Sequence, residues 1–104
     1  MIQDVTGFDW DQGNLEKCQK HGVDIAAIES LFHQAIAVFP DISHSTGEDR
    51  LIGIGKTKKG RHVFVAFTLR TVGNAVLIRP ISARYMHKKE VDHYEKAIAQ
   101  PKNR

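Results

Sequence analysis

The sequence is short of cysteine, of proline and of long apolar runs, and these shortages exclude whole classes of structure. Its single cysteine, Cys18, cannot form a disulfide within the chain, which excludes a disulfide-stabilised scaffold and fits a reducing cytoplasm. No apolar run approaches the roughly 18 residues that a membrane-spanning helix needs. Residues 1–4 carry no basic segment leading into an apolar stretch. We therefore expect no secretion signal, no membrane partner and a cytoplasmic location.

The length and the charge of the chain are both moderate. Its 104 residues predict one domain spanning 1–104, with residues 101–104 as a frayed tail. Lysine and arginine number 15 against 12 for aspartate and glutamate, so the net charge is +3. A mildly basic protein of this kind permits a polyanionic partner without requiring one.

Capping residues and apolar spacing predict three helices. Asp11 and Asp24 are suitable N-caps, and Gly22 is the expected left-handed residue after the first helix. Apolar residues within 25–32 recur at helical spacing, which gives the second helix one buried face. The expected helices run from Asp11 to about Lys20, from Asp24 across 25–32, and from Met86 to about Ala99.

Alternating apolar residues and turn signals predict five strands, the first of them weak. In 61–70 every second residue is apolar, so this strand should bury one face. Pro80 cannot donate to a ladder, so the last strand is either at an edge of the sheet or bulged there. Helices and strands that come in runs predict an α+β fold of order β-α-α-β-β-β-β-α, with the helices on one side of an antiparallel sheet. The expected strands are 2–8, 35–39, 50–56, 61–70 and 75–84.

The last predicted strand carries two arginines, Arg79 and Arg84, which a plain core strand would not need. Arginine is rarely buried without a partner, and its rigid fork of donors suits a phosphate, so the pair predicts an anion-binding surface. Their odd separation puts them on opposite faces of a regular strand. They converge only if a bulge near Pro80, or the exit of the chain from the strand, turns one of them. The alternative is a surface ion pair for each, for example with Glu48 or Glu90.

Four segments spread over residues 8–95 match one known family as a set. The tetrapeptides Lys-His-Gly-Val at 20–23 and Ile-Ser-Ala-Arg at 81–84 are the more specific. In their order and spacing the segments resemble the BrnT toxins of bacterial type II toxin–antitoxin systems. Gly13 and Pro80 depart from the pattern of many relatives, and Pro80 bears on how Arg79 is aimed. The other matching residues are Phe8-Asp9-Trp10-Asp11, His44-Ser45 with Glu48 and Arg50, and Arg79, Glu90 and Tyr94.

The resemblance implies a RelE-like fold and a metal-independent endoribonuclease that needs no cofactor and inhibits translation. It also implies neutralisation by a cognate BrnA-like antitoxin with a ribbon-helix-helix domain, so that operator DNA is reached only through the antitoxin. In such an enzyme the 2′-hydroxyl of the RNA attacks the neighbouring phosphorus. A base takes the hydroxyl proton, an acid protonates the leaving oxygen, and cations stabilise the charged intermediate.

Five residues form the candidate catalytic set under this resemblance. Arg79 and Arg84 would stabilise the phosphate. Arg50 would join them where the polar loop enters the sheet, unless Glu48 or Asp49 neutralises it. His44 and Glu48 would supply the acid and the base, since histidine titrates near neutrality. The alternative for His44 is a solvent-exposed turn residue beside a carboxylate that only orders the loop.

Lys20, His21, Tyr85, His87 and Lys88 are the candidate RNA contacts. Lys20 and His21 end the first predicted helix, where cations also simply cap the last carbonyl groups. His87 and Lys88 open the last helix, where the dipole disfavours cations, and this favours a phosphate-facing role. Tyr85 can stack on a base, and a half-buried structural tyrosine is its plainer alternative.

Three other functions fit parts of the sequence. Six histidines invite a metal site, but there is no His-Glu-x-x-His spacing and no cysteine pair, so we predict no metal. A nucleic-acid-binding module without catalysis would use the same cations through phosphate contacts alone. An adaptor that only holds a partner would use the amphipathic last helix.

Overall fold

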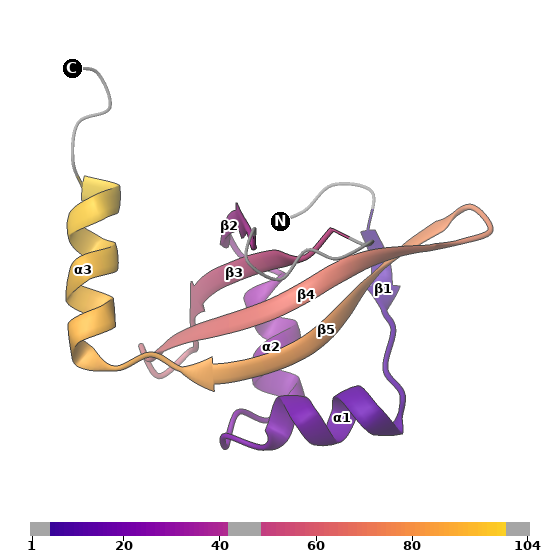
Figure 1. Cartoon of the computed structure of the whole chain (residues 1–104), viewed down its shortest axis with the longest axis horizontal. Helices are drawn as coiled ribbons and strands as arrows, with labels where there is room; N and C mark the ends of the chain where they lie inside the picture. Colours follow the sequence, from indigo (N-terminus) through magenta and orange to yellow (C-terminus); the bar gives the residue numbers. More distant parts are fainter. Residues whose placement is uncertain (1–4, 42–48, 100–104) are drawn as a thin grey trace.

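The structure is a computed structural model that describes residues 5–41 and 49–99. The order of its elements confirms the predicted α+β fold (Figure 1). In this part of the chain no helix is both long enough and apolar enough to cross a membrane. The elements are β1 (Val5–Phe8), α1 (Gln12–Gln19), α2 (Ile25–Leu31), β2 (Ala37–Pro40), β3 (Leu51–Lys56), β4 (His62–Val72), β5 (Ala75–Tyr85) and α3 (Lys88–Ala99).

The described strands form one sheet in the order β1-β5-β4-β3-β2. Neighbouring strands are antiparallel except at one side, where β1 runs parallel to β5 from Val5 opposite Val76 to Phe8 opposite Ile78. The sequence predicted an antiparallel sheet and not this parallel pair. Because β5 is an inner strand, the alternative that Pro80 belongs to an edge strand is wrong.

A bulge in β5 accommodates the proline instead. The register of β4 and β5 pairs Ala66 with Ser82 and then Phe67 with Pro80, which leaves Ile81 as the extra residue. The second of the two predicted arrangements for Pro80 is therefore confirmed. Beyond such a bulge, each side chain of the strand points to the opposite face from the one it would have in a regular strand.

This bulge brings the two arginines of β5 to one face of the sheet. Arg79 stands opposite Thr68, and Arg84 stands opposite Phe64. Residues directly opposite each other point to the same face, and positions 64 and 68 share a face because their separation is even. The condition for convergence is met. At about 3.3 Å per residue, the two arginines start about 13 Å apart along the sheet.

Helices α1 and α2 cover the other face of the sheet, where the core lies. On that side Val63, Val65 and Phe67 of β4 are fully buried, and the ring of Phe32 meets the ring of Phe67 edge-on at 5.0 Å. Figure 1 shows α2 behind the strands. The prediction that the helices pack on one side is confirmed for this pair. The remaining buried core residues are Cys18, Val23, Ile28, Leu31, Ile78 and Ala83.

The first two helices begin at the predicted caps. Asp11 and Asn14 exchange side-chain and backbone hydrogen bonds in a capping box, and the side chain of Asp24 accepts a backbone N–H of α2. Gly22 has the left-handed φ of 90° that a helix end requires. Asn14 is buried and also donates to the Pro80 carbonyl oxygen at 2.8 Å. The backbone N and O of one strand residue point to the same side, and the Pro80 oxygen points toward α1. The nitrogen of Pro80, which has no hydrogen to donate, therefore also points toward α1, and the ladder with β4 loses no bond there.

Helix α3 stands beside the end of the sheet where β5 finishes and β4 begins (Figure 1). None of its residues 88–99 is buried. Its contacts with the sheet are made by the side chains of Glu90, Tyr94 and Glu95, which belong to the site described below.

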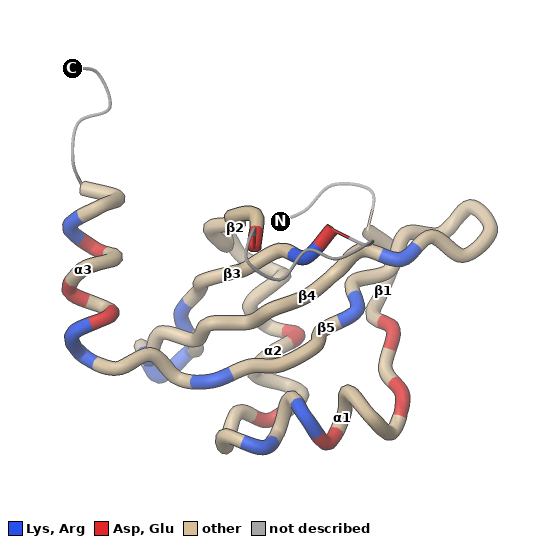
Figure 2. Tube along the Cα trace, viewed as in Figure 1, with Lys and Arg blue, Asp and Glu red and all other residues tan. Residues whose placement is uncertain are grey.

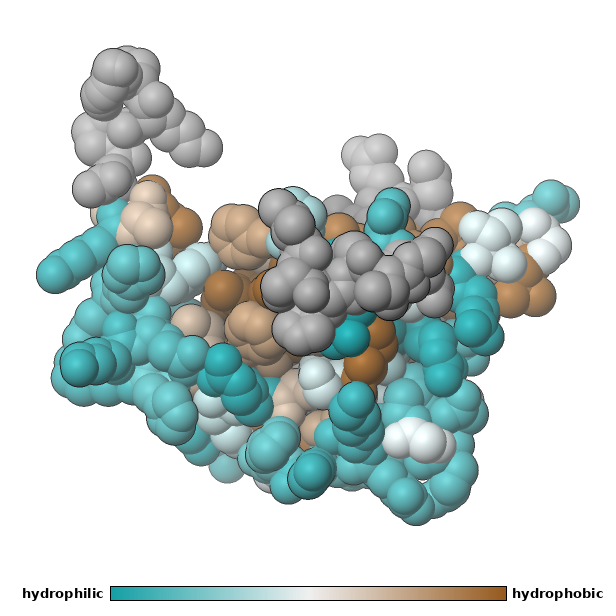
Figure 3. All heavy atoms as spheres, viewed as in Figure 1, coloured by the Kyte–Doolittle hydropathy of each residue, from teal (hydrophilic) through white to brown (hydrophobic). Residues whose placement is uncertain are grey.

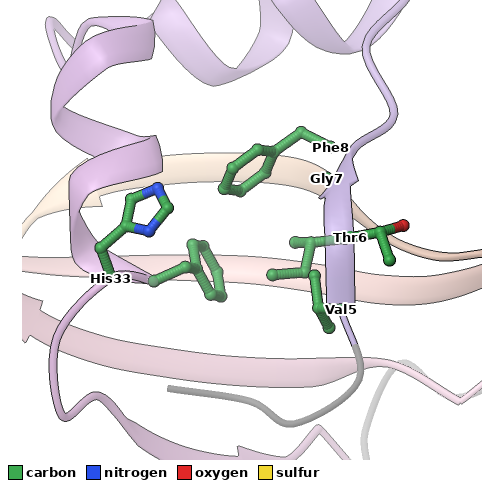
Figure 4. A pocket seen from close by; sticks show the side chains of 7 residues that line it. Val5, Thr6, Gly7, Phe8 and His33 are labelled. Carbon is green, nitrogen blue, oxygen red and sulfur yellow. The ribbon is translucent and has the colours of Figure 1, made fainter.

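A small pocket of about 140 Å³ opens between β1 and the end of α2 (Figure 4). Its described walls are mainly apolar and include Val5, Phe8 and Phe32. His33 lines it as well and packs against Phe8 with ring centroids 6.3 Å apart. This pocket belongs to the packing of β1 against α2 and lies on the helix-covered face, away from the arginines of β5.

Candidate functional site

The candidate site lies on the second face of the sheet, opposite the face that α1 and α2 cover. His62, Phe64 and Thr68 of β4 share this face with Arg79 and Arg84 of β5. Figure 3 shows apolar side chains gathered over the strands beside α3, with hydrophilic side chains around them. The second face thus combines an apolar floor with a few charged groups.

Arg84 is held by a bidentate ion pair with Glu90 in the first turn of α3. Its two terminal nitrogens donate to the two carboxylate oxygens at 2.8 and 2.9 Å, and the guanidinium carbon lies 4.7 Å from the centre of the Phe64 ring. Glu90 also accepts the backbone N–H of His87 at 2.9 Å. The bonds from Arg84 and then from His87 lower the pKa of Glu90 to about 2. The ion pair proposed as an alternative for Arg84 is therefore present.

Arg79 is engaged by two carboxylates from the link between β1 and α1. Its guanidinium donates to Asp11 at 2.7 Å and lies 3.5 Å from Asp9, which also pairs with Arg70 at 3.3 Å. The hydrogen bond with Asp11 is the main cause of a raised Arg79 pKa. Neither partner is one of the glutamates that the sequence suggested. Arg79 is thus more heavily neutralised than Arg84.

His62 is a site residue that the sequence analysis did not identify. Its side chain is 9% exposed, its Nε2 lies 3.6 Å from the Glu95 carboxylate, and its ring lies 6.0 Å from the ring of Tyr94. Burial, and then the nearby Glu95 charge, raise the pKa of Tyr94, which keeps its hydroxyl protonated. The three side chains line a pocket of about 230 Å³ together with Gln34 and Lys56.

His62 and Arg84 are diagonal neighbours on the second face. Arg84 stands opposite Phe64, two positions along β4 from His62, so their Cα atoms are about 7–8 Å apart. The bulge brings Arg79 to this face as well, since a regular strand would send Arg79 and Arg84 to different faces. The signal in the sequence was a histidine directly before the apolar run Val63–Phe67.

Arg50 lies toward the other end of the second face. It comes one residue before Leu51, which pairs with Phe67, so the register places it near the Arg79 end. Its Nε is 3.8 Å from the carboxylate of Asp41, a buried residue that the sequence analysis did not consider. Arg50 and Arg84 are thus not brought together.

The remaining predicted catalytic residues, His44 and Glu48, lie outside the described residues. Their acid–base role stays a prediction. Within the part of the chain that is described, no three His, Cys, Asp or Glu side chains are grouped closely enough to hold a metal ion.

The predicted RNA contacts are divided among several places. Lys20 is the exposed C-cap of α1, and His21 follows it, so both lie on the helix side and away from Arg84. His87 uses its backbone N–H to bind Glu90, and Lys88 pairs with Asp92 at 3.2 Å. Tyr85 points to the helix-covered face, because it stands opposite the core residue Val63. The structure therefore does not gather the five residues into one surface.

One comparison with known proteins identifies the family of this chain. Residues 10–90 match the family model described as the BrnT ribonuclease toxin of type II toxin–antitoxin systems, and these residues are more than three quarters of the chain. No curated protein matches it. The matched region includes β3, β4, β5 and the Arg84–Glu90 pair. The chain therefore belongs to the BrnT family of ribonuclease toxins of type II toxin–antitoxin systems.

Proposed function

We propose that the second face, at the end that carries Arg84 and His62, cleaves RNA internally without a metal ion. The RNA's own 2′-hydroxyl attacks the adjacent phosphorus, as in other metal-free ribonuclease chemistry. The observation that carries the proposal is that β4 and β5 bring a permanent cation and an imidazole to diagonal positions of one face. A ribonuclease toxin family supports the substrate class.

Arg84 stabilises the negative charge that builds on the phosphate during the attack. Its planar fork matches two phosphate oxygens, and one well-placed donor or cation lowers such a barrier by about 3 kcal/mol. Glu90 now holds the fork with both carboxylate oxygens. A carboxylate and the edge of a phosphate offer the same pair of acceptors, so Glu90 marks where the phosphate binds and has to release the fork first.

His62 takes the proton of the 2′-hydroxyl. The Glu95 carboxylate lies 3.6 Å from its Nε2 and holds the imidazole ring in place. Tyr94 keeps its proton and donates a hydrogen bond to a phosphate oxygen. His44 and Glu48 remain predicted members of the acid–base set, and the acid of this set protonates the departing 5′-oxygen as its bond to phosphorus breaks. Arg79 and Arg50 form a second cationic region that positions the RNA farther along the same face.

A cognate antitoxin neutralises the toxin by covering this surface. The sheet offers β1 and β2 as its edges, to which an extended segment of a partner can add as a strand. A BrnA-like ribbon-helix-helix antitoxin would then carry the complex to operator DNA, and the toxin would make no DNA contact of its own.

The test is cleavage of an end-labelled RNA in EDTA by the wild type and by Arg84→Ala, Arg79→Ala and His62→Gln. We expect Arg84→Ala to lower the rate about 10²- to 10³-fold and His62→Gln about 10²-fold or more. His93→Gln is the matched control, because His93 is exposed on α3 and makes none of the contacts described above. All variants should stay folded and melt in one cooperative transition.

Two outcomes would contradict the proposal. A folded wild type that binds RNA but cleaves none would make the chain a nucleic-acid-binding module. Equal cleavage by the wild type, Arg84→Ala and His62→Gln would keep the enzyme but remove the site from this end of the second face.

A further inference from the structure

A basic groove lies on the helix side of the same sheet end. It holds about 390 Å³ between the start of α2 and the turn that joins β3 to β4. Lys58, Lys59 and Arg61 line it from the turn, Tyr85 from β5, and Asp24 from the α2 cap. Figure 2 shows lysine and arginine positions gathered where β3 turns into β4 and where β5 ends. Neither the family description nor the sequence analysis assigns a role to Lys58, Lys59 or Arg61.

The three cations of the groove keep a net positive charge within the described part of the chain. Lys58, Lys59 and Arg61 form no ion pair with any carboxylate in the described part of the chain. Asp24 is the one acid among the groove's described residues, and its Oδ1 is occupied by the Ala27 N–H at 2.8 Å. The groove therefore presents a net positive surface to an anion.

The groove also contains a flat stacking element. The guanidinium carbon of Arg61 lies 3.6 Å from the centre of the Tyr85 ring. Both planes are ones on which a nucleobase stacks, and such stacking tolerates any base. The turn that carries the lysines is held by two backbone bonds of 2.9 Å, from Thr57 N–H to the Arg61 carbonyl and from Gly60 N–H to the Thr57 carbonyl. The cations are thus held on a defined turn beside the stacking pair.

The groove and the proposed cleavage site are joined through two pairs of consecutive residues. Side chains alternate between faces along a strand. Arg61 therefore faces the groove while His62 faces the second face, and Tyr85 faces the groove while Arg84 faces the second face. A single-stranded RNA that passes around this end of the sheet can therefore contact the groove and the cleavage site at consecutive residues of β4 and of β5.

We propose that this groove binds one nucleotide of single-stranded RNA beside the bond that Arg84 and His62 act on. Its base stacks on the outer face of the Arg61–Tyr85 pair, and its phosphates contact Lys58 and Lys59. The inference rests on the proposed function for the identity of the substrate, and its test separates the two. RNA is favoured over an acidic polypeptide because the groove pairs its cations with a stacked aromatic ring, which a carboxylate chain would not use.

The test measures the affinity for a short fluorescent RNA that is 2′-O-methylated at every ribose, which blocks attack by the 2′-hydroxyl. The variant Lys58→Gln/Lys59→Gln removes two phosphate contacts. It should raise Kd about 10- to 30-fold near 0.1 M salt and reduce the slope of log Kd against log salt by about 1.4. With cleavable RNA it should raise KM and leave kcat unchanged. Lys89→Gln/Lys96→Gln removes the same charge from exposed positions of α3 and should change neither value.

The aromatic part of the site is tested separately. Tyr85→Leu should raise Kd about tenfold at every salt concentration, because stacking does not depend on counterions. Tyr85→Phe keeps the ring and should bind as the wild type does, so that a loss in Tyr85→Leu is due to the ring and not to the hydroxyl group.

The outcomes distinguish the groove from the cleavage site. Weaker binding by the groove variants in a protein that cleaves no RNA would support the groove and overturn the proposed function. Normal cleavage, with unchanged KM and Kd in all groove variants, would overturn the groove and leave the function. Loss of binding in the lysine variant alone, with Tyr85→Leu equal to wild type and poly-glutamate competing as well as RNA, would also overturn it.

Discussion

Two groups of cations in this toxin differ in how they are held. Arg79 and Arg84 on β5 are each fixed by carboxylates at 2.7 to 2.9 Å, and their guanidinium forks are aimed by those bonds. Lys58 and Lys59 on the β3–β4 turn have no acidic partner among the described residues. The carboxylates orient the arginine side chains and cancel most of their charge. The lysine side chains keep their full charge, but no acidic partner among the described residues orients them.

This difference assigns RNA binding and catalysis to different groups of cations. Unpaired cations attract a polyanion from a distance and dominate its salt-dependent affinity. A preorganised cation contributes most where charge develops during a reaction, because it needs no reorganisation at that moment. We therefore expect changes at the turn to affect binding and changes on β5 to affect the rate.

The largest expected effect comes from removing the scaffold of the paired group without touching a charge. Asn14 is 6% exposed; its Nδ2 donates to the carbonyl oxygens of Asp9 and Pro80, and its Oδ1 accepts the Asp11 N–H. Asn14→Ala leaves these backbone groups without partners. At 1–3 kcal/mol per unsatisfied buried group, we expect a loss of about 3 kcal/mol in the free energy of unfolding, measured by urea denaturation.

Gln12→Ala is the control for that loss, because Gln12 lies on the same helix and its side chain bonds, among the described residues, only to Glu16 on the surface. It should change the urea midpoint little. A midpoint for Asn14→Ala equal to that of Gln12→Ala would mean that water replaces all three bonds and that α1 does not hold the bulge.

The second prediction compares the two arginines of β5. Arg79 is bound by Asp9 and Asp11, whereas Arg84 has one acidic partner among the described residues, Glu90, and stands diagonal to His62. Arg79→Gln should therefore lower kcat only about tenfold, against 10²-fold or more for Arg84→Gln. Single-turnover cleavage of one labelled RNA measures both. Equal losses would show that the two arginines act on the phosphate together.

The third prediction releases Arg84 from its ion pair. Glu90→Gln removes the carboxylate that competes with phosphate, so the Kd for 2′-O-methylated RNA should fall about threefold, by less than 1 kcal/mol. The same change tests the pKa of about 2. Because the folded-state pKa is depressed from 4.5, the stability that Glu90 contributes is present above pH 4.5 and is lost as the pH falls toward 2.

Urea midpoints of wild type and Glu90→Gln between pH 2 and pH 7 measure this window. The exposed pair contributes at most about 1 kcal/mol near neutrality, and the two midpoints should converge in acid. A constant difference across the range would mean that the Arg84–Glu90 pair does not form in solution.

The fold was largely predictable because its signals are local. Asp11 and Asp24 mark the starts of their helices through hydrogen bonds within one turn, and Gly22 marks a helix end. The apolar alternation in 61–70 predicts a half-buried strand. The parallel pairing of β1 with β5 was not predictable in this way. It joins residues some 70 positions apart, and no local pattern encodes which strand β1 meets.

The site was predictable only in part, for a related reason. Arg79 and Arg84 stood out by composition, but the face they share depends on a one-residue bulge that Asn14 supports from another element. His62 was hidden as an ordinary polar position, because its partners Tyr94 and Glu95 come from α3. Lys58 and Lys59 looked like turn residues until the structure placed Tyr85 beside them.

The smallest expected effect is an unchanged rate of Cys18 labelling in the charge variants, which controls for their folding. Cys18 is fully buried between the helices and the sheet, and burial raises the pKa of its thiol to about 11. Little thiolate forms at pH 8, so a thiol reagent such as Ellman's should label the folded protein only through unfolding. Each charge variant of β5 and of the turn should keep that slow rate, while Asn14→Ala, with about 3 kcal/mol less stability, should react on the order of 10²-fold faster. Rapid labelling of a turn variant would mean that its weaker RNA binding reflects an opened core and not a missing phosphate contact.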